Sequence, residues 1–166
     1  TNNDQALAEK LADELADLAW SMRAEFQKKE AVSIDDAVRL GDAAERGLVV
    51  LSDTGDTVFG GAAGDSNLIL ESVLRLGIQS RVLMPLIAPE TVARLVSAGV
   101  GATVTLPLGG NTAKAFFKPL EVTGVVRRIG GGVVNLGKHA HGEVDMGRAV
   151  VFDVGPVTLL ISELRG

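Results

Sequence analysis

The distribution of glycine divides this chain more sharply than any other property. None of its 20 glycines lies among the first 40 residues, whereas 11 of its 21 acidic residues lie among the first 45. Glycine destabilises helix interiors and is favoured in turns, so the opening can form continuous helix while the remainder needs many turns. We therefore expect a helical lead-in segment over residues 1–46 and an α/β domain over residues 47–166.

Composition and charge restrict the class of protein. With 166 residues, of which 46% are hydrophobic and 22% charged, the chain is long enough for one domain with a buried core. A net charge of -5 argues against binding nucleic-acid phosphates, which needs clustered Lys and Arg. No apolar stretch is long enough for a membrane span, and no basic leader precedes an apolar run. The absence of cysteine fits a reducing compartment, so we expect a cytoplasmic protein.

The first segment has the pattern of an amphipathic helix. Its apolar residues recur at steps of three and four: Leu7, Leu11, Leu15, Leu18, Met22 and Phe26. This spacing places them on one stripe of a long helix, which Asn3 or Asp4 would cap. Because a single apolar stripe is stable only when it is covered, we expect the helix to pack on the rest of this chain or on a neighbour. A homo-oligomer is left open.

Strand and helix patterns alternate through the middle of the chain. Ser33 opens a helix with Asp35 and Asp36 in its first turn, where the helix dipole favours acids, and Gly47 lies near its end. Five segments follow in chain order: a strand over residues 48–51, a helix over 66–76, a strand over 81–84, a helix over 91–98 that Pro89 begins and Gly99 ends, and a strand over 102–106. This alternation is typical of parallel crossover units, so we expect the three strands to be parallel.

Helical signals disappear after Gly109. Strands joined by glycine-rich turns are expected over residues 119–129, 132–136, 149–153 and 157–162. The predicted fold class is therefore α/β, with N-terminal helices, a strand-helix-strand-helix-strand parallel unit and then an antiparallel β layer. Because the last expected strand reaches the terminus with no closing element, we expect a domain of a longer polypeptide.

The densest group of acidic and glycine residues lies between the first expected strand and its helix. Asp53 and Asp56 come just past the strand end. Three glycines that permit close backbone approach follow them, Gly60, Gly61 and Gly64. Ligands of open α/β sheets bind outside the carboxyl ends of strands, where carboxylates can position water, an amide or a cation. The residues leave open whether the two aspartates do this or only support the turn. Asp65 or Ser66 is expected to cap the helix.

Short motifs occur in a fixed order from about Leu48 to the end of the chain. They are Asp53-Thr54-Gly55-Asp56, Gly64-Asp65-Ser66, Pro89-Glu90, Gly99-Val100-Gly101-Ala102-Thr103-Val104, Leu108-Gly109-Gly110 and Asp145-Met146-Gly147-Arg148-Ala149-Val150. The ordered series resembles the C-terminal domain of the MlrC-type family. One departure is that Thr57-Val58-Phe59 stands where the family usually continues with Asn-Pro-Gly.

The resemblance implies part of a metal-dependent peptidase or amide hydrolase. Family members resemble zinc-dependent peptidases, and the namesake opens peptide bonds in linearised microcystin. Their metal ligands belong to the N-terminal domain, so the implied partners are an N-terminal metal-binding domain of the same protein, which would hold the zinc, and a peptide or amide substrate. Asp53 and Asp56 would then face the metal cleft, and Gly60, Gly61 and Gly64 would let the loop approach substrate. The resemblance implies no catalytic residue in this chain, which alone would be inactive. The alternative is a non-catalytic module that binds a small ligand or a protein.

The only two histidines form a second candidate site. His139 and His141 alternate by two, so on a strand they share a face, and imidazoles near a carboxylate can bind zinc. The surrounding glycines instead predict an exposed turn with solvated histidines. A catalytic zinc usually has three protein ligands, so we expect this chain alone to bind zinc weakly.

Overall fold

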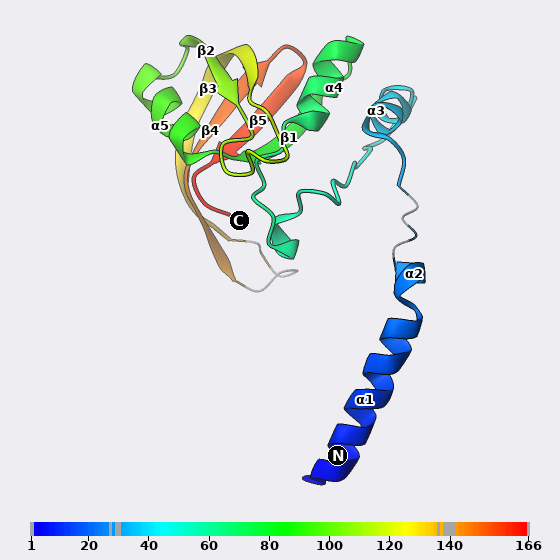
Figure 1. Cartoon of the computed structure of the whole chain (residues 1–166). Helices are drawn as coiled ribbons and strands as arrows, with labels where there is room; N and C mark the ends of the chain where they lie inside the picture. Colours follow the sequence, from blue (N-terminus) through cyan, green and yellow to red (C-terminus); the bar gives the residue numbers. More distant parts are fainter. Residues whose placement is uncertain (1, 27, 29–30, 136, 138–141, 166) are drawn as a thin grey trace. The chain divides into compact units, whose positions relative to one another are not determined.

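The chain divides into two compact units, Thr1–Val32 and Ser33–Gly166. A computed structural model describes residues 2–26, 28, 31–135, 137 and 142–165 (Figure 1). The first unit contains the helices α1 (Gln5–Ser21) and α2 (Arg23–Phe26). The Asp4 carboxylate caps α1 as predicted, because it accepts a hydrogen bond of 3.0 Å from the Leu7 amide. No residue of α1 is buried. The boundary between residues 46 and 47 stays a prediction.

The second unit contains both helices and strands, which confirms the α/β class. In chain order they are α3 (Ile34–Asp42), the 3-10 turn η1 (Val58–Gly60), α4 (Leu68–Leu76), β1 (Val82–Ile87), α5 (Pro89–Ala98), β2 (Thr103–Leu108), β3 (Leu120–Asn135), β4 (Glu143–Val154) and β5 (Val157–Ser162). Local signals set several ends. Ser33 caps α3 and Pro89 opens α5, while α4 and α5 end at Gly77 and Gly99, which have positive φ.

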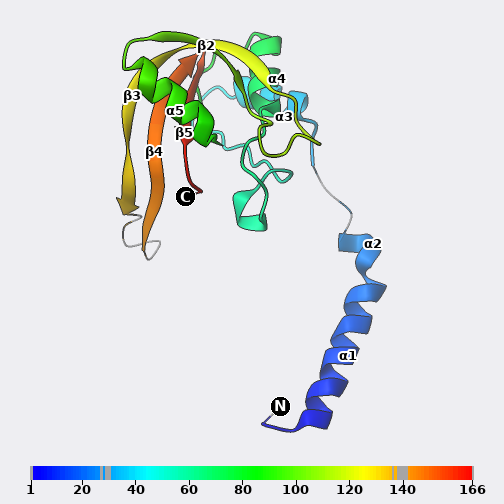
Figure 2. The same ribbon diagram turned by 60° about the vertical axis from the view of Figure 1, so that its left-hand side comes forward.

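The described strands form one mixed sheet in the order β1-β5-β4-β3-β2. β1 and β5 are parallel, and the other neighbouring pairs are antiparallel. The expected parallel unit of consecutive strands was therefore wrong, since the connection through α5 carries the chain from β1 at one edge to β2 at the other. Short-range periodicity identifies strands but not their partners. β3 and β4 form a long two-stranded ribbon (Figure 2). Because β3 runs without a break for 16 residues, the two strands predicted over residues 119–129 and 132–136 belong largely to this one element.

The strand predicted over residues 48–51 is not formed. These four residues lie in irregular chain and are all exposed, from 39% for Leu51 to 89% for Leu48. No described strand pairs with them. The edge strand β1, beside which a further strand could have added, has only β5 as a neighbour. A strand without a ladder partner leaves its N–H and C=O groups to water, which explains why an apolar run alone was not sufficient.

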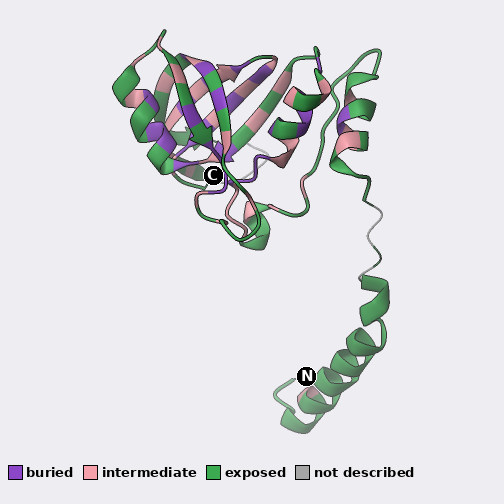
Figure 3. Ribbon diagram, turned by 45° about the horizontal axis from the view of Figure 1, so that its top comes forward, coloured by how far each residue is buried: buried purple, intermediate pink, exposed green. Residues whose placement is uncertain are grey.

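The core lies between the sheet and the two helices α4 and α5. Both helices contribute residues that are at most 2% exposed: Leu70 and Val73 from α4, and Val92 and Leu95 from α5. Alternate residues of β4 and β5 complete the same cluster (Figure 3). Phe152 of β4 is fully buried there. No helix in the described part of the chain is both long and apolar enough to cross a membrane.

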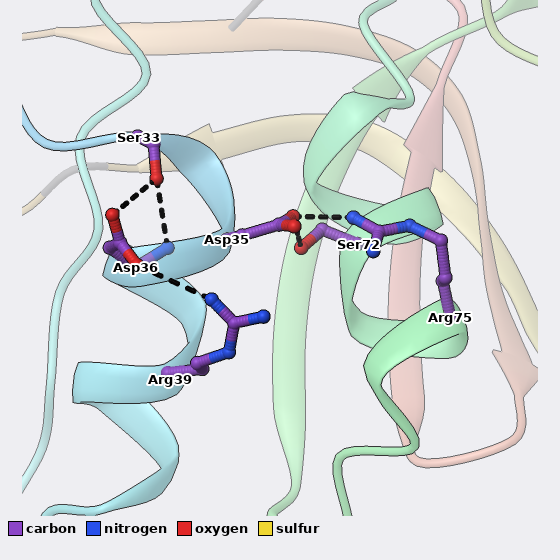
Figure 4. Close-up of polar contacts among 6 residues, drawn as sticks. All are labelled: Ser33, Asp35, Asp36, Arg39, Ser72 and Arg75. Carbon is purple, nitrogen blue, oxygen red and sulfur yellow. Dashed lines mark hydrogen bonds and ion pairs between the residues drawn. The ribbon is translucent and has the colours of Figure 1, made fainter.

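Helix α3 is attached to α4 by a polar contact that the sequence did not predict. Asp35 accepts hydrogen bonds from the Ser72 hydroxyl at 2.7 Å and from the Arg75 guanidinium at 2.5 Å (Figure 4). Both bonds lower the pKa of Asp35 below its ordinary value, and the bond from Arg75 has the larger effect. Asp35 was expected only to complement the dipole of its own helix, whereas it bonds to Ser72 of another helix, 37 residues away in sequence.

Candidate functional site: the acidic loop before α4

The two aspartates of the acidic loop are both half-buried but make different contacts. One oxygen of Asp53, Oδ1, accepts hydrogen bonds from the amides of Gly55 at 2.8 Å and Asp56 at 3.2 Å. Its second oxygen accepts none from the described residues. Asp56 uses both oxygens, because Oδ1 binds the Gly64 amide at 2.9 Å and Oδ2 binds the Ser66 amide at 2.7 Å. Asp56 therefore closes the loop, while Asp53 keeps one oxygen that can contact a ligand.

The three predicted glycines also differ in their surroundings. A Cβ on Gly61, whose φ is +88°, would have no atom within 4 Å, so its backbone borders open space. On Gly64, with φ of +72°, a Cβ would lie 2.6 Å from Val58 Cγ1 and 2.8 Å from Ile87 Cδ1. On Gly60 it would lie 3.1 Å from Thr57. Gly64 thus allows the loop to pack on the domain, whereas the backbone at Gly61 has no described atom packed against it.

Asp65 does not cap α4, contrary to the prediction. The N-cap residue is Asn67, and it makes no side-chain cap bond. Asp65 is 1% exposed, and its Oδ2 accepts hydrogen bonds from the amides of Thr112 at 2.7 Å and Ala113 at 3.3 Å. Its backbone oxygen accepts another from Gly110 at 2.9 Å. Tertiary contacts with a loop 47 residues away have replaced the local cap.

Asn67 contacts the same distant loop, a role that the sequence did not predict. It is 1% exposed, and its Nδ2 donates to the backbone oxygens of Leu108 at 2.8 Å and Lys118 at 2.7 Å. Gly109, with φ of +76°, lies so close that a Cβ would be 2.7 Å from Asn67 Cβ. The glycine pair at 109 and 110 was the available signal, since adjacent glycines indicate close backbone approach. They did not show what approaches.

The Asp145-to-Val150 motif has a structural explanation. Asp145 Oδ1 accepts a 2.8 Å hydrogen bond from the Gly147 amide, which forms a turn of the same kind as that of Asp53. Arg148 pairs with Glu163 through its guanidinium and its backbone amide. Both kinds of bond lower the pKa of Glu163 below its ordinary value, and the side-chain bond has the larger effect. The motif fixes the end of β5 against β4.

The described residues do not form a metal centre. Among them, no group of three or more His, Cys, Asp or Glu side chains is arranged to hold a metal ion. His139 and His141 lie outside the described residues. Asp56 and Asp65 already direct carboxylate oxygens at backbone amides, as expected of structural acceptors rather than ligands. The described part of this chain therefore does not fit a resident zinc site.

Comparison with known proteins identifies the family. The family model described as MlrC C-terminus matches residues 51–166. The chain belongs to the MlrC C-terminal family. Microcystinase C of Sphingomonas sp. is 29% identical over 169 residues, which cover 99% of this chain. A solved structure of a candidate metallopeptidase from Mesorhizobium sp. BNC1 has a TM-score of 0.79 and 31% identity over 92% of this chain. The resemblance drawn from the ordered motifs is confirmed.

Both relatives are much longer than the region that they share with this member of the MlrC C-terminal family. The matched region makes up 32% of the microcystinase and 31% of the chain in the solved structure. Roles that depend on the remaining two thirds of those proteins are outside what the similarity covers.

Proposed function

We propose that this chain is the C-terminal domain of a metal-dependent peptidase or amide hydrolase, and that it supplies loops of the substrate cleft. The match of residues 51–166 to the MlrC C-terminus carries this proposal. The names of the two relatives, a microcystinase and a candidate metallopeptidase, support hydrolysis as the reaction class. The proposal assigns the metal, zinc, to an N-terminal domain of the same protein, because the described residues offer no metal centre.

Each residue of the acidic loop has a separate role in this proposal. A metal ion bound by the N-terminal domain would supply an activated water and would polarise the amide carbonyl. Asp53 orients the substrate through Oδ2, since Oδ1 is committed to the turn. Asp56 holds the loop shut through Gly64 and Ser66, and Gly61 lets substrate approach the backbone. These are binding and positioning roles, so the chain alone is expected to be inactive.

The test compares two aspartates that make the same turn contact in different places. In the full-length protein, Asp53→Ala should reduce kcat/KM for a peptide substrate by about tenfold or more, equivalent to about 1.4 kcal/mol of lost transition-state binding. Asp145→Ala is the matched control, because it removes an equivalent 2.8 Å bond to the amide two residues later. It should leave kcat/KM nearly unchanged.

Thermal unfolding of both variants separates a loss of function from a loss of fold. Equal effects of the two substitutions on kcat/KM, or no effect of Asp53→Ala, would remove Asp53 from the substrate cleft. A well-folded full-length protein that hydrolyses no amide, but binds a small ligand through the same loop, would favour the non-catalytic binding module instead.

A further inference from the structure

The loop between β2 and β3 is attached to the acidic loop at both of its ends. Near its start, the Asp65 carboxylate accepts hydrogen bonds from the backbone amides of Thr112 and Ala113, and the Asp65 backbone oxygen accepts one from Gly110. At its far end, Asn67 binds the backbone oxygen of Lys118. Both side chains are 1% exposed, so they cannot touch a ligand on the surface. What they control is the backbone of residues 109–118.

These attachments are directional and cannot be exchanged for one another. Both amide hydrogens of Asn67 have carbonyl partners, at 2.7 and 2.8 Å, which fixes the orientation of its side chain. Only Oδ2 of Asp65 is used, whereas its Oδ1 is buried without a hydrogen-bond partner among the described residues. The contacts that are made to residues 112 and 113 therefore require one acceptor oxygen and not a full carboxylate.

The centre of the same loop presents a large aromatic ring to solvent. Phe116 is 82% exposed, although it lies beside half-buried Phe117 with ring centroids 6.4 Å apart. A loop restrained at both ends cannot easily rotate to cover such a ring. Exposed side chains on loops that a rigid scaffold positions are typical of ligand contacts, and an aromatic ring there offers a large apolar area.

We propose that residues 111–117 form a second substrate-contact loop, which Asp65 and Asn67 position and in which Phe116 contacts an apolar side chain of the amide substrate. This rests on the proposed function, because it specifies the substrate that the same cleft prefers. Asp56 connects the two loops, since it holds Gly64 and Ser66 on either side of Asp65. Asp65 and Asn67 are positioning residues, and Phe116 is a specificity-determining residue.

The first experiment tests the attachment by amide hydrogen exchange in this chain, without any substrate. Asp65→Ala should speed exchange at Thr112 and Ala113 by about tenfold or more, while amides of the central strands β4 and β5 keep their protection. Asp65→Asn should preserve most of the protection, because it retains one acceptor oxygen. Equal protection of Thr112 and Ala113 in Asp65→Ala and the unaltered chain would overturn the attachment. Loss in Asp65→Asn as complete as in Asp65→Ala would overturn the inference that one acceptor oxygen is sufficient, because the charge would then be the essential property.

The second experiment tests Phe116 in the full-length protein with two peptide substrates. One carries an apolar side chain at a given position, and the other is identical except that a hydrogen replaces that side chain. Phe116→Ala should raise KM for the apolar substrate by roughly tenfold and leave kcat nearly unchanged, which corresponds to losing contact with about 60 Å² of apolar surface. KM for the other substrate should not change. Since Phe116 is exposed, this variant should fold even if Asp65→Ala does not.

Leu83→Ala is the control, because Leu83 is a comparably exposed apolar residue, 75% exposed, on the edge strand β1. It should change neither KM. An equal effect of Phe116→Ala on both substrates, or none on either, would overturn the role of Phe116. Failure of the unaltered protein to hydrolyse either substrate would instead overturn the proposed function, and the exchange experiment would still decide whether Asp65 holds the loop.

Discussion

Residues 48–51 and strand β5 are both short apolar segments rich in Val and Leu, yet only one of them is a strand. In β5, Val157, Leu159 and Ile161 are at most 1% exposed, and the backbone pairs with β1 on one side and β4 on the other. In residues 48–51, Leu48 and Val50 are 89% and 78% exposed. The backbone there pairs with no described strand.

The difference arises from how each segment meets a partner. A tight turn with Gly155 at φ of +56° connects β4 directly to β5, so a neighbouring strand is available at once. Residues 48–51 are followed by the acidic loop, and the residue of that loop that meets the edge strand β1 is Gly64, whose backbone oxygen accepts a 2.8 Å hydrogen bond from the Ile87 amide. Hydrophobicity makes a segment able to form a strand, but the partner decides whether it does.

Truncating one apolar side chain in each segment should give the largest difference, measured as the loss in free energy of unfolding. Leu159→Ala removes a side chain that is 0% exposed, so it should lower the free energy of unfolding by about 2–5 kcal/mol. Val50→Ala should change it by less than about 0.5 kcal/mol. Denaturant titration of both variants gives the comparison. A loss of several kcal/mol for Val50→Ala would show that residues 48–51 are buried after all.

Alanine at two glycines of the acidic loop tests how tightly this segment is attached to the domain. Both glycines have positive φ, which should cost an alanine about 1–2 kcal/mol. Gly64→Ala should cost about 1–3 kcal/mol more, because its Cβ would overlap Val58 and Ile87, whereas that of Gly61 would meet open space. Denaturant titration measures both. Equal losses would mean that the loop moves away freely and does not pack at Gly64.

The smallest effect concerns acid stability and the carboxylate of Glu163, which follows the last residue of β5. Bonds from Arg148 depress the pKa of Glu163 in the folded state, so its stabilising contribution is present above the ordinary range of a glutamate. That contribution should be lost as the pH falls below about 4, where the folded state too takes up the proton. The Tm difference between the unaltered protein and Glu163→Gln should therefore be constant near neutral pH and shrink in acid.

Glu121→Gln serves as the control for that pH series, since Glu121 is an exposed residue of β3 that makes no side-chain hydrogen bond to the described residues. It should show little difference in Tm at any pH. A Tm difference for Glu163→Gln that stays unchanged into acid would mean that the charge of Glu163 contributes nothing to the fold.

Several features of this protein were determined by the sequence alone because their causes lie within a few residues. Asp4 and Ser33 cap helices, Pro89 opens one, and Gly99 ends it, as their neighbours in the chain indicated. Capping depends on bonds that span three or four residues, which sequence shows directly. The ordered motifs likewise identified the family, since their succession is itself a property of the sequence.

Only the tertiary structure decided which distant groups meet. It placed β5 and not β2 beside β1, left residues 48–51 without a ladder, and directed Asp65 at Thr112 instead of at its own helix. It also distinguished Asp53 from Asp56, which the sequence treated alike. Of these two aspartates, only Asp56 accepts hydrogen bonds with both carboxylate oxygens, from amides up to 10 residues away. A carboxylate binds whichever donors the fold brings within about 3 Å, and those donors are set by packing, which no local pattern encodes.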